Sequence, residues 1–236
     1  MYTFQSRVRY SETDKSGFLS LNAVVNYMQD CSTFQSEDLG IGIDYLKKHH
    51  YIWLMNSWQI VLKSLPRLGE KITVGTFAYG FKGIYGYRNF LIKDEEEKEL
   101  ALANSIWVLY DTEKNMPKKV STEHVEGYPI EPKLEMESMP RKIQIPEQGE
   151  KREAFPVRYY HIDTNQHVNN GQYIQMAQEF LPEDFKVGQV RAEYRKSAVY
   201  GDWIHPYVIT QSDKYIVCLN ETEEKTFAVI EFSKSE

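Results

Sequence analysis

The 236-residue sequence predicts an α+β fold built from two similar halves, each with one long helix against an antiparallel β-sheet. Three observations predict it: short motifs recur in the same order, each half carries one helical apolar stripe, and β-rich segments follow each stripe. A helix that is followed only by strands can bury its stripe only against a sheet. We therefore expect each sheet to curve around its helix.

The internal repeat is carried by short matches that occur in the same order in both halves, at an offset of 149 residues for the first match below and 127 for the second. Val8-Arg9-Tyr10 followed by Asp14 matches Val157-Arg158-Tyr159 followed by Asp163. Further on, two acidic clusters also correspond to each other, Glu96-Glu97-Lys98 and Glu223-Glu224-Lys225. One match could arise by chance, but several matches in the same order indicate a repeated structural unit.

Local patterns place the elements within each half. The apolar stripe of residues 22–39 predicts the first helix, and Gly40 is suited to end it. Residues 170–181 predict the second helix, which Pro182 ends. Strand-like runs flank both acidic clusters, so each cluster is expected to be a solvated hairpin turn. These runs are residues 89–93, 100–110, 215–219 and 226–232.

Prolines mark the boundary between the halves. Of the nine prolines, Pro117, Pro129, Pro132, Pro140 and Pro146 lie in a stretch without helical or strand periodicity. The sequence therefore predicts an N-terminal unit over residues 1–115, a proline-rich linker over 116–150 and a C-terminal unit over 151–236.

Composition excludes several classes of protein. The formal net charge of -6 argues against broad nucleic-acid binding, which needs a basic face. Two cysteines, Cys31 and Cys218, are too few for a disulfide framework and are expected to be small buried residues. No run of apolar residues reaches the length of a membrane span. With no signal-like start, we expect a cytoplasmic protein.

The densest polar cluster, residues 161–173, directly precedes the second predicted helix. Its structural interpretation is a loop that ends in Asn169 or Asn170 as the helix N-cap. Its functional interpretation depends on alternation, because an extended stretch would place Asp163, Asn165 and His167 on one side. Beside a helix N-terminus, a carboxylate, an amide and an imidazole suit acyl transfer.

The cluster resembles the signature of the acyl-carrier-protein thioesterases of plants and bacteria, from Asp163-x-Asn165-x-His167 through Val168-Asn169-Asn170 to Tyr173. The segment Glu193-Tyr194-Arg195-Lys196-Ser197 is similar to the next motif of that family, and residues 10–19 resemble the opening of hotdog thioesterases more broadly. The resemblance implies a double (tandem) hotdog, in which a long helix wrapped by an antiparallel sheet occurs twice in one chain. It also implies hydrolysis of fatty acyl-acyl carrier protein to free fatty acid.

This resemblance assigns the catalytic network to Asp163, Asn165 and His167, with Ser197, Asn169 and Asn170 as possible auxiliary residues. Plant members carry a Glu and a Cys where this chain has Ser197 and Ala198. A cysteine nucleophile and a glutamate base at these positions are therefore excluded. Either Asp163 or His167 is expected to activate water, and an acyl-enzyme on Asp163 is the less favoured alternative. No metal or cofactor is expected, since the 4'-phosphopantetheine arrives on the substrate.

The remaining expectations concern the acyl chain and the partner. The first half is expected to supply the acyl pocket, with Met28, Phe34, Trp53 and Trp58 as wall residues. Acyl carrier protein is acidic, so its docking face should be locally basic despite the net charge. The docking candidates are Arg191, Arg195 and Lys196. The tandem repeat is compatible with a monomer containing an internal pseudo-dimer, or with a homodimer.

Several alternatives stay open. Asp14 lies in an Asp-x-x-Gly turn that is catalytic in single-domain hotdog thioesterases, although a turn aspartate bonding its own backbone is the simpler interpretation. His161, Asp163 and His167 could ligate a metal on paper, but their spacing matches no zinc signature. The chain could also be an acyl-CoA thioesterase, or a non-catalytic acyl-thioester-binding hotdog protein.

Overall fold

The computed structural model describes residues 1–235, which form two compact units. The N-terminal unit consists of residues 1–56 and 62–138, and the C-terminal unit of residues 57–61 and 139–235. Residues 57–61 lie within a single strand, so neighbouring parts of that strand belong to different units. Each unit is described by itself below.

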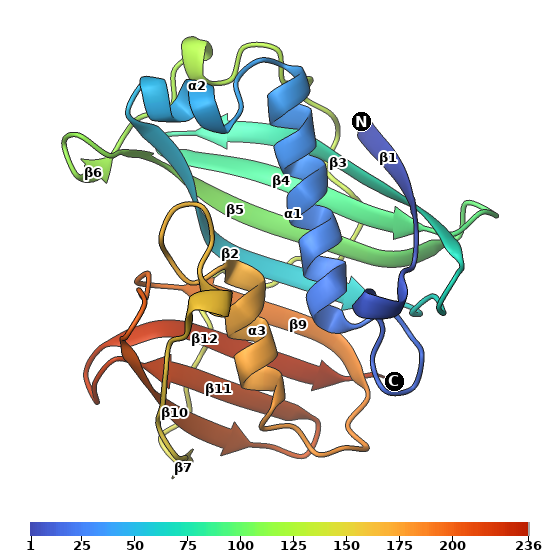
Figure 1. The fold of residues 1–236 in the computed structure, drawn as a ribbon, viewed down its shortest axis with the longest axis vertical. Coiled ribbons are helices and arrows are strands. Elements are labelled where there is room, and N and C mark those ends of the chain that lie inside the picture. The colour runs from blue at the N-terminus through green and yellow to red at the C-terminus, as the bar shows by residue number, and fades with distance from the viewer. Residues whose placement is uncertain (236) are drawn as a thin grey trace. The chain divides into compact units, whose positions relative to one another are not determined.

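The N-terminal unit consists of one long helix and an antiparallel sheet with the strand order β1-β3-β4-β5-β2 (Figure 1). Its elements are β1 (Tyr2–Arg7), η1 (Tyr10–Glu12), α1 (Leu21–Asp38), α2 (Ile43–Lys48), β2 (Tyr51–Leu62), β3 (Lys71–Lys82), β4 (Tyr85–Lys93), β5 (Glu99–Asp111), β6 (Met116–Pro117) and η2 (Thr122–His124). Helix α1 crosses the sheet and packs against β3 and β1. This is the hotdog arrangement expected for the first half.

Helix α1 begins and ends one residue before the predicted positions 22 and 39. The Ser20 hydroxyl accepts a hydrogen bond from the Ala23 N–H over 3.2 Å, which caps the first turn. Gly40 follows the helix with φ 71°, a left-handed conformation that costs glycine least. The buried face starts with apolar residues such as Val24 and Met28 but continues with the polar residue Gln35. That change along the helix is not predicted from its apolar stripe.

The C-terminal unit repeats the arrangement, with a strand order of β2-β9-β12-β11-β10-β7 (Figure 1). Only Ser57–Val61 of β2 belong to this unit. Its elements are β7 (Glu150–Lys151), β8 (Phe155–Pro156), η3 (Tyr159–His161), α3 (Asn170–Gln178), β9 (Val187–Tyr194), β10 (Trp203–Thr210), β11 (Lys214–Asn220) and β12 (Thr226–Lys234). The second hotdog is therefore confirmed, with α3 packed against β11 and β12.

Helix α3 ends at Gln178, three residues before the predicted end at Leu181. After Gln178 the backbone tightens, since the Phe180 N–H donates to the Ala177 carbonyl and the Leu181 N–H donates to the Gln178 carbonyl. Such three-residue spacing is usual where a helix unwinds. Pro182, which lacks an N–H, then prevents any continuation.

The acidic clusters form the exposed hairpin turns that the sequence predicts. In the first, Asp94 Oδ1 accepts hydrogen bonds from the N–H groups of Glu96 and Lys98, both over 2.9 Å. Glu97 adopts φ 63° at the tip. The turn connects β4 to β5, and the equivalent turn connects β11 to β12.

One part of the proline-rich stretch hydrogen-bonds to the sheet of the N-terminal unit, and another part packs on the sheet of the C-terminal unit. In the N-terminal unit, the Glu131 N–H donates to the Ala78 carbonyl of β3 over 3.0 Å. In the C-terminal unit, Ile143 is 1% exposed and packs in an apolar cluster on the sheet. The cluster's other members are Ile209, Ile216, Cys218 and Val229. Although this stretch has no periodic pattern, it is a packed part of the fold.

Two expectations from composition are also answered. Cys31 and Cys218 are both buried, and burial raises the pKa of Cys31 to about 12 and that of Cys218 to about 11. Both thiols therefore stay protonated and act as small core residues, as expected. None of the helices within residues 1–235 is long and apolar enough to cross a membrane.

Candidate active site

The predicted catalytic residues lie in a tight turn between η3 and α3. The Asp163 N–H donates to the His167 carbonyl over 2.8 Å, and the Gln166 N–H donates to the Asp163 carbonyl over 3.0 Å. Ile162 and Val168 pair across the base of the turn. The expectation of an extended stretch, with alternate side chains on one side, is therefore wrong. The chain reverses here, and the turn rather than strand alternation sets the side-chain directions.

Asp163 also stabilises the turn that carries it. Its Oδ1 accepts a hydrogen bond from the Asn165 N–H over 2.7 Å, a common turn role for aspartate. No described residue hydrogen-bonds to its Oδ2, so that oxygen is available to a water molecule or substrate. Asp163 and His167 are partly buried, and Asn165 is exposed.

The same turn occurs in the N-terminal unit at the positions that the sequence repeat predicts. There the Asp14 N–H donates to the Phe18 carbonyl over 2.8 Å, and Asp14 Oδ1 accepts from the Ser16 N–H over 2.8 Å. The left-handed position is filled by Gly17 in one turn, with φ 78°, and by Gln166 in the other, with φ 63°. The structural interpretation of Asp14, a turn aspartate that bonds its own backbone, is confirmed.

The two turns differ in the side chains that they present. Where the second turn has Asn165 and His167, the first has Ser16 and Phe18. The ring of Phe18 lies under the Arg67 guanidinium, 4.4 Å from ring centroid to Cζ. The shared backbone geometry is therefore a folding feature of the repeat, and the amide and imidazole distinguish the second copy.

Asn169 has the structural role that capping preferences predict. Its Oδ1 accepts a hydrogen bond from the Gly171 N–H over 2.8 Å and caps α3. The Gly171 N–H is therefore occupied and does not serve as an oxyanion donor. Asn170 begins the helix, and its carbonyl accepts a hydrogen bond from the Tyr194 hydroxyl over 2.8 Å.

Two buried tyrosines of the sequence motifs, to which no role was assigned from the sequence, anchor this region. The Tyr173 hydroxyl accepts a hydrogen bond from the Ala198 N–H over 2.7 Å, while the Ala198 carbonyl accepts from the Val168 N–H over 2.9 Å. Burial raises the pKa of Tyr173, with the carboxylates of Asp202 and Asp163 adding to the effect. Burial likewise raises the pKa of Tyr194, so both hydroxyls stay protonated. The position of Tyr173 at the end of the motif that begins at Asp163 was the sequence feature that could have indicated this role.

Ser197 and the two basic residues before it are exposed beside this anchored segment. Arg195 pairs with Glu193, with Nε 3.0 Å from Oε1, and Lys196 pairs with Glu221 over 2.6 Å. The Ser197 hydroxyl forms no hydrogen bond within the described chain, so nothing connects it to Asp163 or His167.

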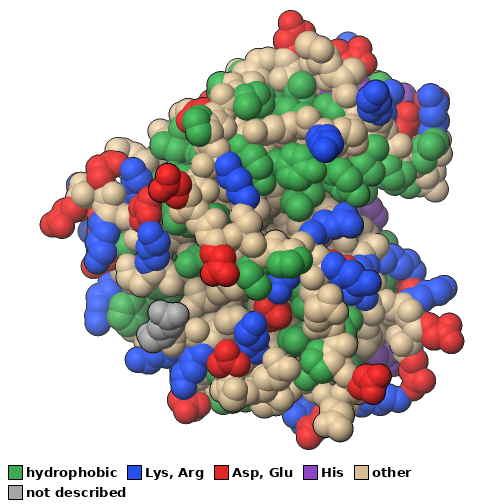
Figure 2. Space-filling view, turned by 180° about the vertical axis from the view of Figure 1, so that it is seen from behind, with side chains coloured by type: hydrophobic (Ala, Val, Ile, Leu, Met, Phe, Trp, Pro, Cys, Tyr) green, Lys and Arg blue, Asp and Glu red, His purple; other side chains and the backbone are tan. Residues whose placement is uncertain are grey.

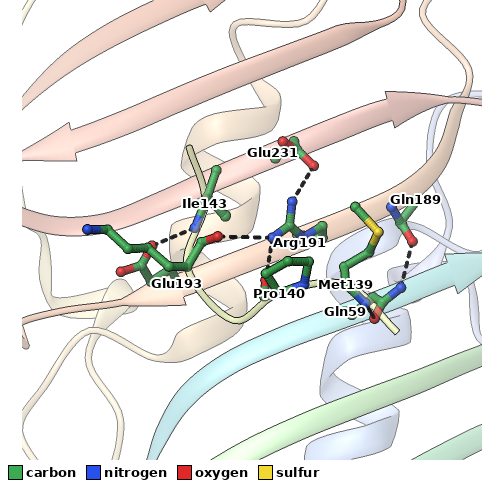
Figure 3. Close-up of polar contacts among 9 residues, drawn as sticks. Gln59, Met139, Pro140, Ile143, Gln189, Arg191, Glu193 and Glu231 are labelled. Carbon is green, nitrogen blue, oxygen red and sulfur yellow. Dashed lines mark hydrogen bonds and ion pairs between the residues drawn. The ribbon is translucent and has the colours of Figure 1, made fainter. Parts of the chain in front are cut away.

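Arg191 is buried, contrary to its expected place on a docking face. It is 6% exposed, and its Nη1 lies 2.9 Å from Glu231 Oε1 (Figure 3). Its Nη2 donates to the Pro140 carbonyl over 2.5 Å, which ties the proline-rich stretch to β9. A buried, paired guanidinium is not exposed to a partner protein, so the expectation that Arg191 lies on a docking face is wrong.

The pocket candidates are not all together. Met28 is fully buried on α1, Phe34 is 44% exposed on the same helix, and Trp53 lies in β2 of the same unit. Trp58 belongs to the part of β2 that groups with the C-terminal unit and is 2% exposed. Only the first three therefore share the N-terminal unit.

Comparison with known proteins agrees with both halves of the chain. Residues 1–128 match the acyl-ACP thioesterase N-terminal domain, and residues 145–233 match the acyl-ACP thioesterase C-terminal domain. The chain belongs to the acyl-ACP thioesterase family. The resemblance identified from the residue motifs is thereby confirmed, and these matches cover more than half of the sequence.

Relatives of this acyl-ACP thioesterase family member are distant in sequence. It is 24% identical to an oleoyl-acyl carrier protein thioesterase of Arabidopsis thaliana over 87% of this chain and 63% of the relative. It is 26% identical to an acyl-[acyl-carrier-protein] hydrolase of Cuphea viscosissima over 80% of this chain and 50% of that protein. The chain therefore spans about half to two thirds of the length of these relatives.

Solved structures of acyl-ACP thioesterases share the fold. One from Bacteroides thetaiotaomicron superposes with a TM-score of 0.89 at 20% identity, covering 99% of this chain and 97% of that one. The 12:0-ACP thioesterase from Umbellularia californica gives 0.84 at 16% identity, covering 100% and 98%. At such identities the likeness establishes the double hotdog fold of this chain.

Proposed function

We propose that this chain hydrolyses the thioester of fatty acyl-acyl carrier protein, releasing free fatty acid and carrier protein. The observation that carries the proposal is the difference between the two turns. Both units contain the same aspartate turn, yet only the C-terminal turn also contains an asparagine and a histidine, Asn165 and His167. A folding role alone accounts for the aspartate but not for Asn165 and His167.

The proposed reaction is attack of a water molecule on the thioester carbonyl. Asp163, through its Oδ2, or His167 accepts a proton from the water as the new C–O bond forms, and the Asn165 amide orients the water. The carbonyl electron pair moves to oxygen and returns as the C–S bond breaks. The proton then passes to the departing phosphopantetheine thiolate, so the base is regenerated. Neither a metal nor a covalent intermediate is needed.

The partner proposed for this reaction is acyl carrier protein, which is acidic. Arg195 and Lys196 remain as docking candidates because both are exposed and follow the Tyr194 anchor. Each is paired with a carboxylate of this chain, so a carrier protein would compete with Glu193 and Glu221 for them. On the face drawn in Figure 2, basic side chains are mixed with acidic ones. If this electrostatic attraction drives docking, salt will screen it, and the affinity for the carrier protein should fall as the salt concentration rises.

A non-catalytic acyl-thioester-binding role is the second candidate function. The departure at Ser197 favours it, because the resemblance to plant members implies a Glu at the position where this chain has a serine. The Ala198 backbone is bonded on both sides, and its methyl group provides no acid or base. This candidate predicts tight binding of acyl thioesters without release of a thiol.

The deciding experiment measures thiol release from acyl-acyl carrier proteins of increasing chain length, with the matched acyl-CoA series in parallel. Turnover on the carrier protein at a higher kcat/KM than on CoA supports the proposal. Faster turnover on CoA would indicate an acyl-CoA thioesterase. Saturable binding of both series without thiol release would establish the non-catalytic role.

A further inference from the structure

Arg88 is a buried cation that no carboxylate neutralises within residues 1–235. It lies on β4 of the N-terminal unit and is 8% exposed. The C-terminal unit shows the usual alternative, because the buried Arg191 there is paired with Glu231. The titratable groups that act on the pKa of Arg88 are Tyr128 and Cys31, and neither is a carboxylate.

One edge of the Arg88 guanidinium donates hydrogen bonds to described residues of the protein, and the other edge donates none to them. Its Nη1 donates to Gln35 Oε1 over 2.5 Å and to Thr76 Oγ1 over 3.1 Å. No described residue accepts a hydrogen bond from Nε or Nη2. Both nitrogens keep a small solvent-accessible surface, because neither is among the fully enclosed polar atoms that lack a partner.

The guanidinium is held in place from several elements. Gln35 comes from α1, and the Thr76 hydroxyl of β3 is itself fixed by donating to the Asn89 carbonyl over 3.0 Å. The Tyr128 ring lies 5.0 Å from the guanidinium carbon, and its hydroxyl shares a 2.6 Å hydrogen bond with Ser36. The free edge therefore has a set direction before any ligand binds.

A group with a matching negative charge would stabilise this arrangement. Burial lowers the pKa of Arg88, yet an arginine keeps its proton in a protein, so the charge stays. The Nε and Nη2 hydrogens form the fork that binds a carboxylate through two parallel hydrogen bonds. A purely apolar ligand beside this edge would leave the charge uncompensated.

We propose that Arg88, held by Gln35 and Thr76, binds the carboxylate of a fatty chain inside the N-terminal unit. The inference rests on the proposed function, because a thioesterase of this family brings a fatty chain to the protein. The carboxylate has two sources: the distal end of an acyl chain that carries one, or the free fatty acid released by hydrolysis.

Binding of free acids tests the site without requiring hydrolysis. Isothermal titration would compare octanoate, octanedioate and methyl octanoate on the wild type and on Arg88→Met. The wild type should bind at least one of the two acids more tightly than the ester, and Arg88→Met should lose about tenfold or more for that acid alone. Arg88→Lys keeps the charge without the fork and should restore part of the affinity. Arg67→Met, at an exposed arginine of the same unit, should behave as wild type.

Hydrolysis then separates the two sources. A distal carboxylate predicts that Arg88→Met lowers kcat/KM for 7-carboxyheptanoyl-acyl carrier protein but not for octanoyl-acyl carrier protein. A site for the product predicts unchanged kcat/KM on both and weaker inhibition by octanoate. Equal affinity of folded wild type and Arg88→Met for both acids would overturn the proposal. Absence of any hydrolysis, with acid binding that depends on Arg88, would refute the proposed function and leave this site intact.

Discussion

The hydroxyl of Tyr173 accepts the hydrogen bond of the Ala198 N–H over 2.7 Å, and this bond joins α3 to the segment after β9. The Ala198 carbonyl in turn accepts a hydrogen bond from Val168, the residue that closes the Asp163 turn. A buried side chain on the helix is thus connected through one alanine to the turn that carries Asp163.

Removing that hydroxyl should destabilise the C-terminal unit. In Tyr173→Phe the buried Ala198 N–H has no acceptor, which costs about 1–3 kcal/mol. Urea unfolding followed by fluorescence measures the loss. Tyr160→Phe is the control, because Tyr160 is 78% exposed. Equal midpoints for the two variants would contradict the assigned role of Tyr173.

The paired turns allow the catalytic role of Asp163 to be separated from its folding role. Asparagine retains an oxygen that accepts the turn hydrogen bond, so Asp163→Asn and Asp14→Asn should both fold. Only Asp163→Asn removes a proposed catalytic carboxylate, and we expect it to lose about 100-fold or more in kcat. A similar loss of thiol release in both variants would assign the effect to the turn.

Asn165 and His167 should be needed for turnover but not for folding. Neither side chain is part of the buried core, so alanine at either position should leave the unfolding midpoint close to wild type. We expect each variant to reduce thiol release by about 100-fold or more, the scale of a lost acid-base or positioning group. Turnover within a few-fold of wild type in both would remove them from the mechanism.

Removing one member of the buried Arg191–Glu231 pair should lower the free energy of unfolding strongly, whereas replacing both members should lower it much less. Arg191→Met leaves the Glu231 carboxylate buried without its partner, and we expect a loss of about 3–5 kcal/mol. Adding Glu231→Leu removes the stranded charge and should recover much of that loss. Denaturant midpoints for the single and double variants measure both effects. An additive further loss in the double variant would show that the pair matters through packing alone.

Two buried histidines should make stability fall with mild acid. Burial lowers the pKa of His161 and of His124 from the ordinary value of 6.5. Below pH 6.5 the unfolded chain therefore binds protons that the folded chain does not, so the free energy of unfolding decreases as the pH falls. Unfolding midpoints between pH 7.5 and about 5.5 should show this decrease, and the double variant His124→Gln/His161→Gln should show less of it. A pH slope unchanged in that variant would assign the effect to other groups.

Features that depend on neighbouring residues were predictable from the sequence. The helix start at Asn169, the acidic turns and the Asp14 turn all depend on side chains that hydrogen-bond to backbone a few residues away. Hydrogen bonds of this kind join residues close in sequence, so the order of the residues predicts them. The spacing of the motifs likewise indicated the family. The identity of Asp163, Asn165 and His167 as candidate residues came from the same source.

Only the tertiary structure decided which charges are buried and which backbone groups hydrogen-bond to side chains distant in sequence. Arg88 and Arg191 both lie in strands, where their sequence neighbours do not indicate whether a carboxylate lies across the sheet. Among residues 1–235, Glu231 pairs with Arg191 and no carboxylate pairs with Arg88. The same holds for the contact of Tyr173 with Ala198 and for the packing of Ile143. These contacts join segments distant in sequence, and the free energy of burying a charge depends on what the fold places beside it.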